Sequence, residues 1–172
     1  MKQSSSIYTL ITFFFVLSLI FTACKSSIST DKEEKEVKAI DLIIEKWHNA
    51  ATEADFATYF ELMDPEAYFI GTDASEKWNI DEFKTFCEPI FAKGSAWEFK
   101  KIEREIFIDK SGKIAWFDET LDTWMGVCMS SGVVVKTING WKIKHYQLSL
   151  HVPNEIVQDF MKLVDTAENT NI

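Results

Sequence analysis

A long strand-like segment, from Trp97 to Leu150, limits the choice of fold for this chain. Apolar and β-branched residues fill it in extended runs, and two turn signals, DKSG at 109–112 and ING at 138–140, divide it. The pattern predicts three or four antiparallel strands in a meander, each long enough to curl.

Helical periodicity in the preceding segment predicts elements that can cover one face of such a sheet. Apolar residues recur at helical spacing over residues 37–51, which predicts an amphipathic helix of about four turns. Asp55 is placed to cap a second, shorter helix. Asn79 and Glu82 have the spacing of a capping box that opens a third helix.

The order of these elements indicates an α+β fold. A short apolar strand, AYFIG at 67–71, lies between the second and third helices, and Pro153 with Asn154 introduces a last helix, Glu155 to Val164. We therefore expect a cone-shaped, curved antiparallel sheet packed by about three N-terminal helices plus a C-terminal helix.

The N-terminal residues predict a membrane-anchored lipoprotein. The apolar run Leu10–Phe21 is too short for a permanent transmembrane helix but suits the core of a signal peptide. FTAC at 21–24 resembles a bacterial lipobox, and lipidation of Cys24 would hold a soluble domain on the membrane. No aspartate follows Cys24, which favours the outer membrane of the cell envelope. A plain secretory signal with an incidental cysteine is the alternative.

Composition divides the rest of the chain. We expect a signal peptide at 1–23, a disordered tether at 24–36, one domain at 37–165 and a flexible tail at 166–172. The net charge of −9 disfavours binding of nucleic acid.

The chemical motifs of the mature domain are few. Cys87 and Cys128 either pair or remain two buried thiols. The domain contains no CxxC or HExxH motif and no glycine-rich phosphate loop, so we expect no metal and no cofactor.

Three segments carry a family resemblance: YFIGTDASEKW at 68–78, AWFDE at 115–119 and GWKIKHYQLS at 140–149. With the order of elements, they resemble the SnoaL-like branch of the nuclear-transport-factor-2-like superfamily, over roughly residues 36–164. The last segment is also similar to the association domain of calcium/calmodulin-dependent kinase. The resemblance implies a cone whose open end is a pocket, often in a homodimer formed through the sheet. The superfamily includes isomerases, dehydratases, cyclases and transport adaptors, so the resemblance implies no single activity.

Strand alternation predicts which way His145 points. Residues 141, 143, 145, 147 and 149 share one face, and Lys142 and Lys144 share the other. Because lysine rarely faces a core, we expect His145 to face inward and to line a pocket with Trp141 and Gln147. A core histidine with fixed hydrogen-bond partners is the alternative.

The lysine side of the same strand becomes apolar toward its end, at Tyr146, Leu148 and Leu150. An apolar surface there would suit a dimer partner. This strand therefore predicts the position of the homodimer contact.

A carboxylate among apolar neighbours marks the strand from Ile114 to Trp124. Alternation turns Glu119 inward, whereas a slip of one residue would turn Asp118 inward instead. A buried carboxylate has a raised pKa and can serve as a general acid or base, with His145 as its partner. An ion-paired structural carboxylate is the alternative.

Two residues near the third helix are candidates for ligand binding. Trp78, at the head of the helix, could stack on a flat ligand or pack on the core. Asp73 follows the first strand, about where the superfamily's ketosteroid isomerases carry a general base, but their oxyanion-binding residues have no match here.

Two classes of function follow from these residues. The favoured one is a lipoprotein that binds a small apolar or aromatic ligand. The alternative is a cofactor-independent isomerase, cyclase or dehydratase that uses Glu119 or Asp118 with His145. Binding is favoured because the sequence assembles no nucleophile–base pair.

Overall fold

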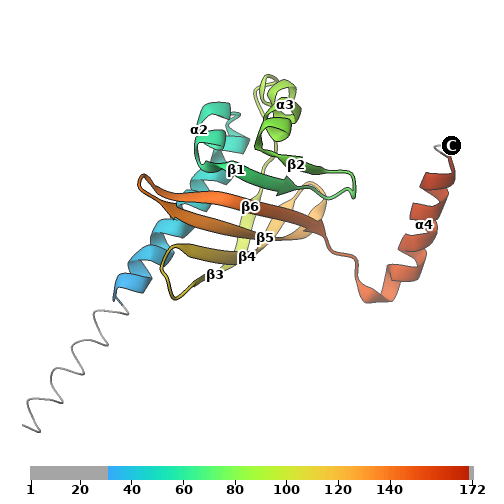
Figure 1. Cartoon of the computed structure of the whole chain (residues 1–172). Helices are drawn as coiled ribbons and strands as arrows, with labels where there is room; N and C mark the ends of the chain where they lie inside the picture. Colours follow the sequence, from blue (N-terminus) through green and yellow to red (C-terminus); the bar gives the residue numbers. More distant parts are fainter. Residues whose placement is uncertain (1–30, 171–172) are drawn as a thin grey trace, which may run out of the picture. The chain divides into compact units, whose positions relative to one another are not determined.

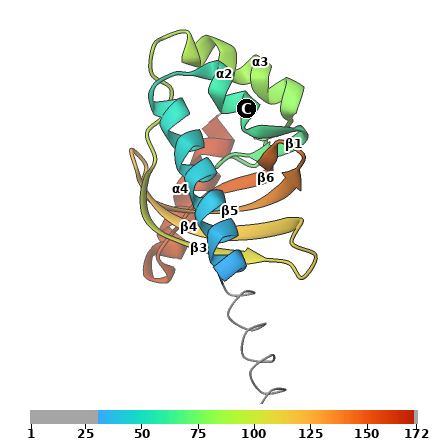
Figure 2. The same ribbon diagram turned by 90° about the vertical axis from the view of Figure 1, so that its left-hand side faces the viewer.

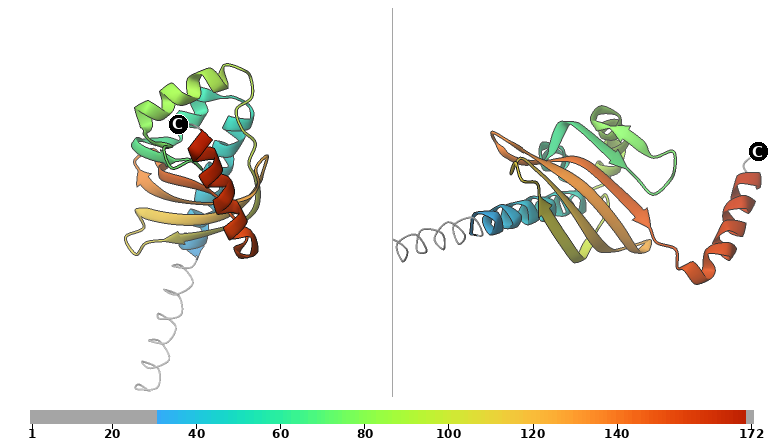
Figure 3. Two further views of the ribbon diagram at one scale, coloured as in Figure 1. Left: turned by 90° about the vertical axis from the view of Figure 1, so that its right-hand side faces the viewer. Right: turned by 60° about the horizontal axis from the view of Figure 1, so that its bottom comes forward.

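The computed structural model describes residues 31–170 of the 172-residue chain. Six strands form one sheet (Figure 1): β1 (Met63–Ile70), β2 (Lys77–Asn79), β3 (Lys100–Ile108), β4 (Ile114–Thr123), β5 (Gly126–Thr137) and β6 (Gly140–Leu150). Their spatial order is β2-β1-β6-β5-β4-β3. Neighbouring strands are antiparallel except β1 and β6, which are parallel. The sheet curves without closing (Figure 3), and the predicted α+β class is confirmed.

Helices cover one face of this sheet, which we call the inner face; the opposite side is the outer face (Figure 2). The first helix runs to residue 52, and α2 (Phe56–Glu61) and α3 (Ile80–Phe91) follow. Both predicted caps are confirmed. The Asp55 carboxylate accepts a hydrogen bond from the Thr58 amide, and Asn79 with Glu82 forms a complete capping box.

The core lies between the first helix and the inner face. Ile40, Ile44 and Trp47 contribute the buried stripe of the helix. Phe117 and Tyr146 meet them from β4 and β6 and are fully buried. The centroids of the Trp47 and Tyr146 rings are 4.8 Å apart in an edge-to-face arrangement, which is one of the geometries that aromatic pairs prefer.

A β-bulge in β6 makes the predicted orientation of His145 wrong. Val133 of β5 is opposite His145, but Val134 is opposite Ile143, so Lys144 is an extra residue on β6. An extra residue exchanges the faces of all residues beyond it. Trp141 and Ile143 therefore face inward, but His145 and Gln147 face outward.

The same bulge removes the predicted dimer contact on β6. Tyr146 and Leu148 lie on the inner face and are buried within the chain. They are core residues, so they cannot contact a second copy of the chain.

The two ends of the chain depart from the predicted boundaries. Residues 31–36, expected in the tether, are helical. At the other end, η1 (Asn154–Ile156) leads into α4 (Val157–Thr170), so residues 166–170 continue a helix that was expected to give way to a flexible tail. None of the helices within residues 31–170 is long and apolar enough to cross a membrane. Cys24 and the predicted signal peptide lie outside the described residues.

Candidate functional site

An aromatic cavity, the inner cavity, lies on the inner face beside α3. Its volume is about 160 Å³. The lining residues come from β1, the β1–β2 turn, β2, α3, the segment before β3, the β4–β5 turn and β6: Phe69, Gly71, Thr72, Glu76, Trp78, Phe83, Phe86, Ile90, Trp97, Phe99, Trp124, Met125 and Leu148. Most of these side chains are aromatic. The composition suits a flat apolar molecule.

Stacked rings form the α3 side of the inner cavity. The Trp78 ring lies parallel to Phe86, with centroids 4.4 Å apart, and is also stacked on Phe83 at 5.6 Å. Phe83 in turn is stacked on Phe69 of β1 at 4.1 Å. Trp78 thus lines the cavity and packs on its neighbours at the same time, so both sequence interpretations describe its position.

Trp124 gives the cavity an exposed aromatic rim. It lies in the turn between β4 and β5, and 84% of its surface is accessible to solvent. Met125 lies next to it and also lines the cavity. The sequence analysis missed Trp124 because a single tryptophan beside a turn has no pattern that separates a binding residue from an incidental one.

Asp73 lies outside the inner cavity, in the exposed turn between β1 and β2. Its carboxylate accepts hydrogen bonds from the amide and hydroxyl of Ser75, which lower its pKa. Glu76 of the same turn does line the cavity, as does Thr72, and the Glu76 carboxylate accepts a hydrogen bond from the Asp73 amide at 3.2 Å. A Cβ at Gly71 would lie 2.1 Å from the same carboxylate, so a larger residue there would require the Glu76 side chain to move.

Glu119 is buried at the centre of a polar network on the inner face, with 2% of its surface exposed. Its Oε1 accepts hydrogen bonds from the Ser130 hydroxyl at 2.7 Å and the Tyr146 hydroxyl at 2.9 Å. His48 Nε2 lies 2.9 Å from the same oxygen. Because an ionised carboxylate can only accept, His48 donates this bond.

Arg104 holds the second oxygen of Glu119. Its Nε donates to Oε2 at 2.8 Å, and its Nη2 lies 2.7 Å from that oxygen in an ion pair without hydrogen-bond alignment. Arg104 Nη1 donates to Asp41 Oδ1 at 2.6 Å. The network therefore connects the first helix, which carries Asp41 and His48, to four strands of the sheet.

These contacts keep Glu119 ionised. Burial alone would raise the pKa of Glu119, but the hydrogen bond and electrostatic effect of His48, the charge of Arg104 and the Ser130 hydroxyl lower it to about 2. The ion-paired structural carboxylate was the alternative reading of the sequence, and this geometry matches it. An acid with so low a pKa is a weak base near neutral pH, and each of its oxygens is already occupied.

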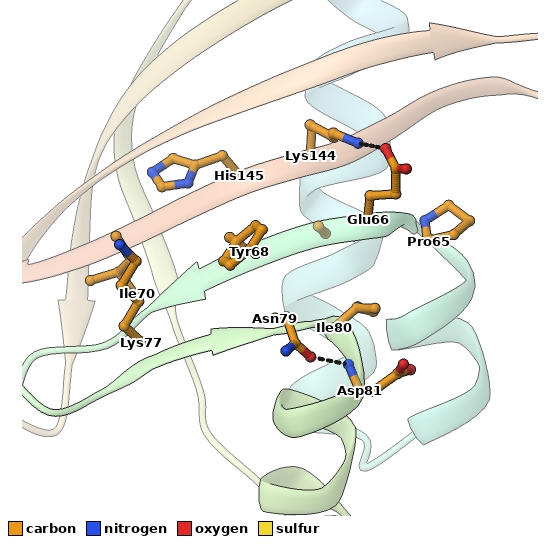
Figure 4. A pocket seen from close by; sticks show the side chains of 11 residues that line it. Pro65, Glu66, Tyr68, Ile70, Lys77, Asn79, Ile80, Asp81, Lys144 and His145 are labelled. Atoms are coloured by element: carbon orange, nitrogen blue, oxygen red, sulfur yellow. Dashed lines mark hydrogen bonds and ion pairs between the residues drawn. The ribbon is translucent and has the colours of Figure 1, made fainter.

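His145 lies on the outer face, in a groove between β6, β1 and the start of α3 (Figure 4). The groove has a volume of about 930 Å³, and Tyr68, Ile70 and Lys77 line it beside His145. Partial burial lowers the pKa of His145, and the charge of Lys77 lowers it further. Neighbouring Lys144 forms ion pairs with Asp64 at 2.8 Å and Glu66 at 2.9 Å.

The structure does not bring the predicted catalytic residues together. Glu119 faces inward, whereas Asp118 is exposed and, like His145, faces outward. The histidine beside Glu119 is His48, so the predicted partnership with His145 is wrong. A signal for His48 was present, since it follows Ile44 by four positions on the buried stripe of the first helix.

Trp141 and Gln147 line neither the inner cavity nor the outer groove. Trp141 is buried, and Lys136 Nζ lies 5.5 Å from the centroid of its ring, whereas Gln147 is exposed. Cys87 and Cys128 are both buried and unpaired, and burial raises the pKa of the Cys87 thiol to about 12. Within the described part of the chain, no three potential ligands gather in a metal-binding arrangement.

Comparisons with known proteins agree on the architecture. The model of the SnoaL-like domain family matches residues 40–154. A nuclear-transport-factor-2-like protein of unknown function from Pseudomonas putida superposes with a TM-score of 0.59 at 12% identity, over 72% of this chain and 91% of that one. No curated protein sequence matches the chain.

Two further solved structures share the fold. A protein from Streptomyces avermitilis, described as a candidate dehydratase of the same superfamily, gives a TM-score of 0.61 at 16% identity, over 70% of this chain and 99% of that one. A candidate calcium/calmodulin-dependent protein kinase II association domain from Xanthomonas campestris gives 0.51 at 15% identity, over 67% and 86%. At these identities the likeness concerns the fold alone.

Proposed function

We propose that the chain, which belongs to the family of SnoaL-like domains, binds a small, flat apolar or aromatic molecule in the inner cavity. The observation that carries the proposal is a cavity of about 160 Å³ lined mainly by aromatic rings, with Trp124 exposed at its rim. An apolar cavity of roughly 150 Å³ is enough to bind benzene. The ligand, or the part of it that enters, is therefore about one ring in size.

Binding is favoured over proton-transfer catalysis by the state of the buried carboxylate. Glu119 is not among the residues that line the inner cavity, and its oxygens are occupied by donors from His48, Ser130, Tyr146 and Arg104. The carboxylate at the cavity, Glu76, holds the β1–β2 turn. Both acids have structural tasks that a reaction would disrupt.

Binding of p-cresol tests the proposal, with the Cys24→Ser chain used as soluble protein. We expect saturable binding by calorimetry and ligand-observed NMR. Trp124→Ala should weaken it about fivefold to tenfold, because it removes an aromatic contact worth roughly 1 kcal/mol. Since Trp124 is mostly exposed, the variant should remain folded, and unfolding by urea checks this. Phe107→Ala, an aromatic deletion on the outer face, is the matched control. Absence of binding, or equal loss in both variants, would refute the proposal.

We also propose that the outer face forms a homodimer contact. One residue from each of five strands forms a row across this face: Phe107, Trp116, Val133, His145 and Tyr68. Three of them, Phe107, Trp116 and Tyr68, are exposed. Such an exposed apolar row on a sheet is typical of an interaction surface.

Charges on the outer face are distributed so that the face can complement itself. Acidic residues lie on β3 and β4: Glu103, Glu105, Asp118 and Asp122. Basic residues lie on β6 and β2: Lys142, Lys77 and Lys144, of which Lys144 is already paired with Asp64 and Glu66 of β1. A two-fold axis between two stacked sheets, running along the strands, would place the acidic half of one sheet over the basic half of the other.

We propose, finally, that the chain is a lipoprotein of the bacterial cell envelope, anchored through Cys24. The absence of an aspartate directly after Cys24 favours the outer membrane. The FTAC segment supports the anchor. Intact-mass analysis of the membrane fraction should find an acylated Cys24 as the first residue. A soluble product that starts elsewhere would remove the anchor.

A further inference from the structure

The C-terminal helix α4 carries an apolar stripe that none of the described residues, 31–170, buries. Val157, Phe160, Met161 and Val164 recur at helical spacing, and none of them is buried. The principal contact of α4 is with η1, directly before it. A helix of 14 residues is marginally stable in water unless its apolar face packs against something. We therefore expect the apolar stripe of α4 to pack against another surface.

The inner face has an exposed apolar edge at the end of β6, where the chain leaves the sheet. Leu121, Cys128 and Leu150 are aligned across β4, β5 and β6 on the inner face. The first two are fully buried, but 44% of Leu150 is exposed. Trp124, at the rim of the inner cavity, is exposed in the turn directly beside this row. Leu150 and Trp124 are thus apolar side chains that remain exposed at this end of the described sheet.

We propose that α4 docks over this end of the inner face and forms the missing wall of the inner cavity. Residues 151–156 separate β6 from α4 and can span at most about 20 Å, comparable with the length of α4 itself. A linker this short keeps α4 at an effective concentration of roughly millimolar near its own sheet. That local concentration favours the helix of the same chain over that of a second copy.

The docked helix narrows the class of ligand. This inference about the ligand rests on the proposed binding function. The docked helix would add two apolar side chains, Phe160 and Val164, to the exposed side of a cavity already lined by aromatic rings. A ligand enclosed in this way has to be apolar on both of its faces, as a plain ring is. Closing the rim should also slow its release.

Disulfide trapping tests the position of α4 without any ligand. In the Cys24→Ser background, Met125→Cys is combined with Val164→Cys, and the protein is oxidised at low concentration with glutathione disulfide. The native Cys87 and Cys128 are buried and do not compete. We expect an intrachain disulfide, identified by peptide mapping. The control variant combines Met125→Cys with Lys162→Cys, and residue 162 lies on the opposite side of α4 from residue 164. This control should form at least fivefold less intrachain disulfide.

The outcomes separate the docking of α4 from the ligand-binding proposal. Equal or absent cross-linking in both pairs would overturn the docking, and an interchain disulfide would assign α4 to a second copy instead. Phe160→Ser should lower the affinity for p-cresol about fivefold if docking closes the cavity. If the intrachain disulfide forms but p-cresol does not bind, the proposed position of α4 stands and the ligand-binding proposal is refuted. Binding that is unchanged by Phe160→Ser would refute the closing role of α4.

Discussion

Glu119 is a charged side chain whose burial is compensated by neighbours from distant parts of the sequence. Alternation along its strand was enough to predict that a carboxylate faces inward. Its partners could not be predicted, because His48 lies 71 positions away and Arg104 lies 15 positions away on a neighbouring strand. Whether a buried acid is a base or a fixed anion depends on these donors, so its chemical role could not be assigned from its own strand.

Replacing Glu119 with glutamine should destabilise the domain by about 3–5 kcal/mol, because it removes the buried one of the carboxylates that pair with Arg104. The free energy of unfolding in urea measures the effect. Asp118→Asn removes the neighbouring, exposed carboxylate and should change stability by less than about 0.5 kcal/mol. A small effect at Glu119 would show that Arg104 finds compensation elsewhere, for example from Asp41.

Stability should fall in acid through the same group. The pKa of Glu119 is about 2 in the folded protein, against 4.5 for an unperturbed glutamate. Its ionised form therefore contributes stability above pH 4.5, about 3 kcal/mol, which is lost as the pH falls toward 2. The difference in unfolding free energy between the wild type and Glu119→Gln should shrink over that interval. A difference that stays constant with pH would contradict the low pKa.

At the scale of elements, caps were predictable and the bulge was not. A cap depends on residues three positions apart, and both Asp55 and Asn79 behave as their spacing indicates. The bulge at Lys144 arises from how β6 pairs with β5 and β1, which sequence alternation alone does not record. One extra residue therefore reversed the orientation assigned to His145.

Gly132, beside the bulge, has no room for a side chain. A Cβ there would lie 2.4 Å from the Phe117 ring and 2.9 Å from the His145 carbonyl oxygen. Because Phe117 is fully buried, Gly132→Ala should cost about 1–3 kcal/mol in unfolding free energy. Ser131→Ala, at the adjacent exposed position, should be nearly neutral. Equal stability of the two variants would mean that the ring can move aside.

At the scale of the molecule, the outer face predicts the state of assembly. Light scattering of the Cys24→Ser chain should give twice the chain mass. Trp116→Lys places a charge in the centre of the apolar row and should yield monomers. Ile138→Lys, at a fully exposed position in the β5–β6 turn, should remain dimeric. A wild-type monomer at tens of micromolar would refute the contact.

The network around Glu119 has a consequence for how the domain folds. Its members are supplied by the first helix and by β3, β4, β5 and β6, so no single hairpin can assemble it. Until the helix docks, Glu119 and Arg104 have to stay hydrated, which opposes early collapse of the inner face. The docking of the helix should therefore be a late event, and loss of the His48 bond should accelerate unfolding more than it slows folding.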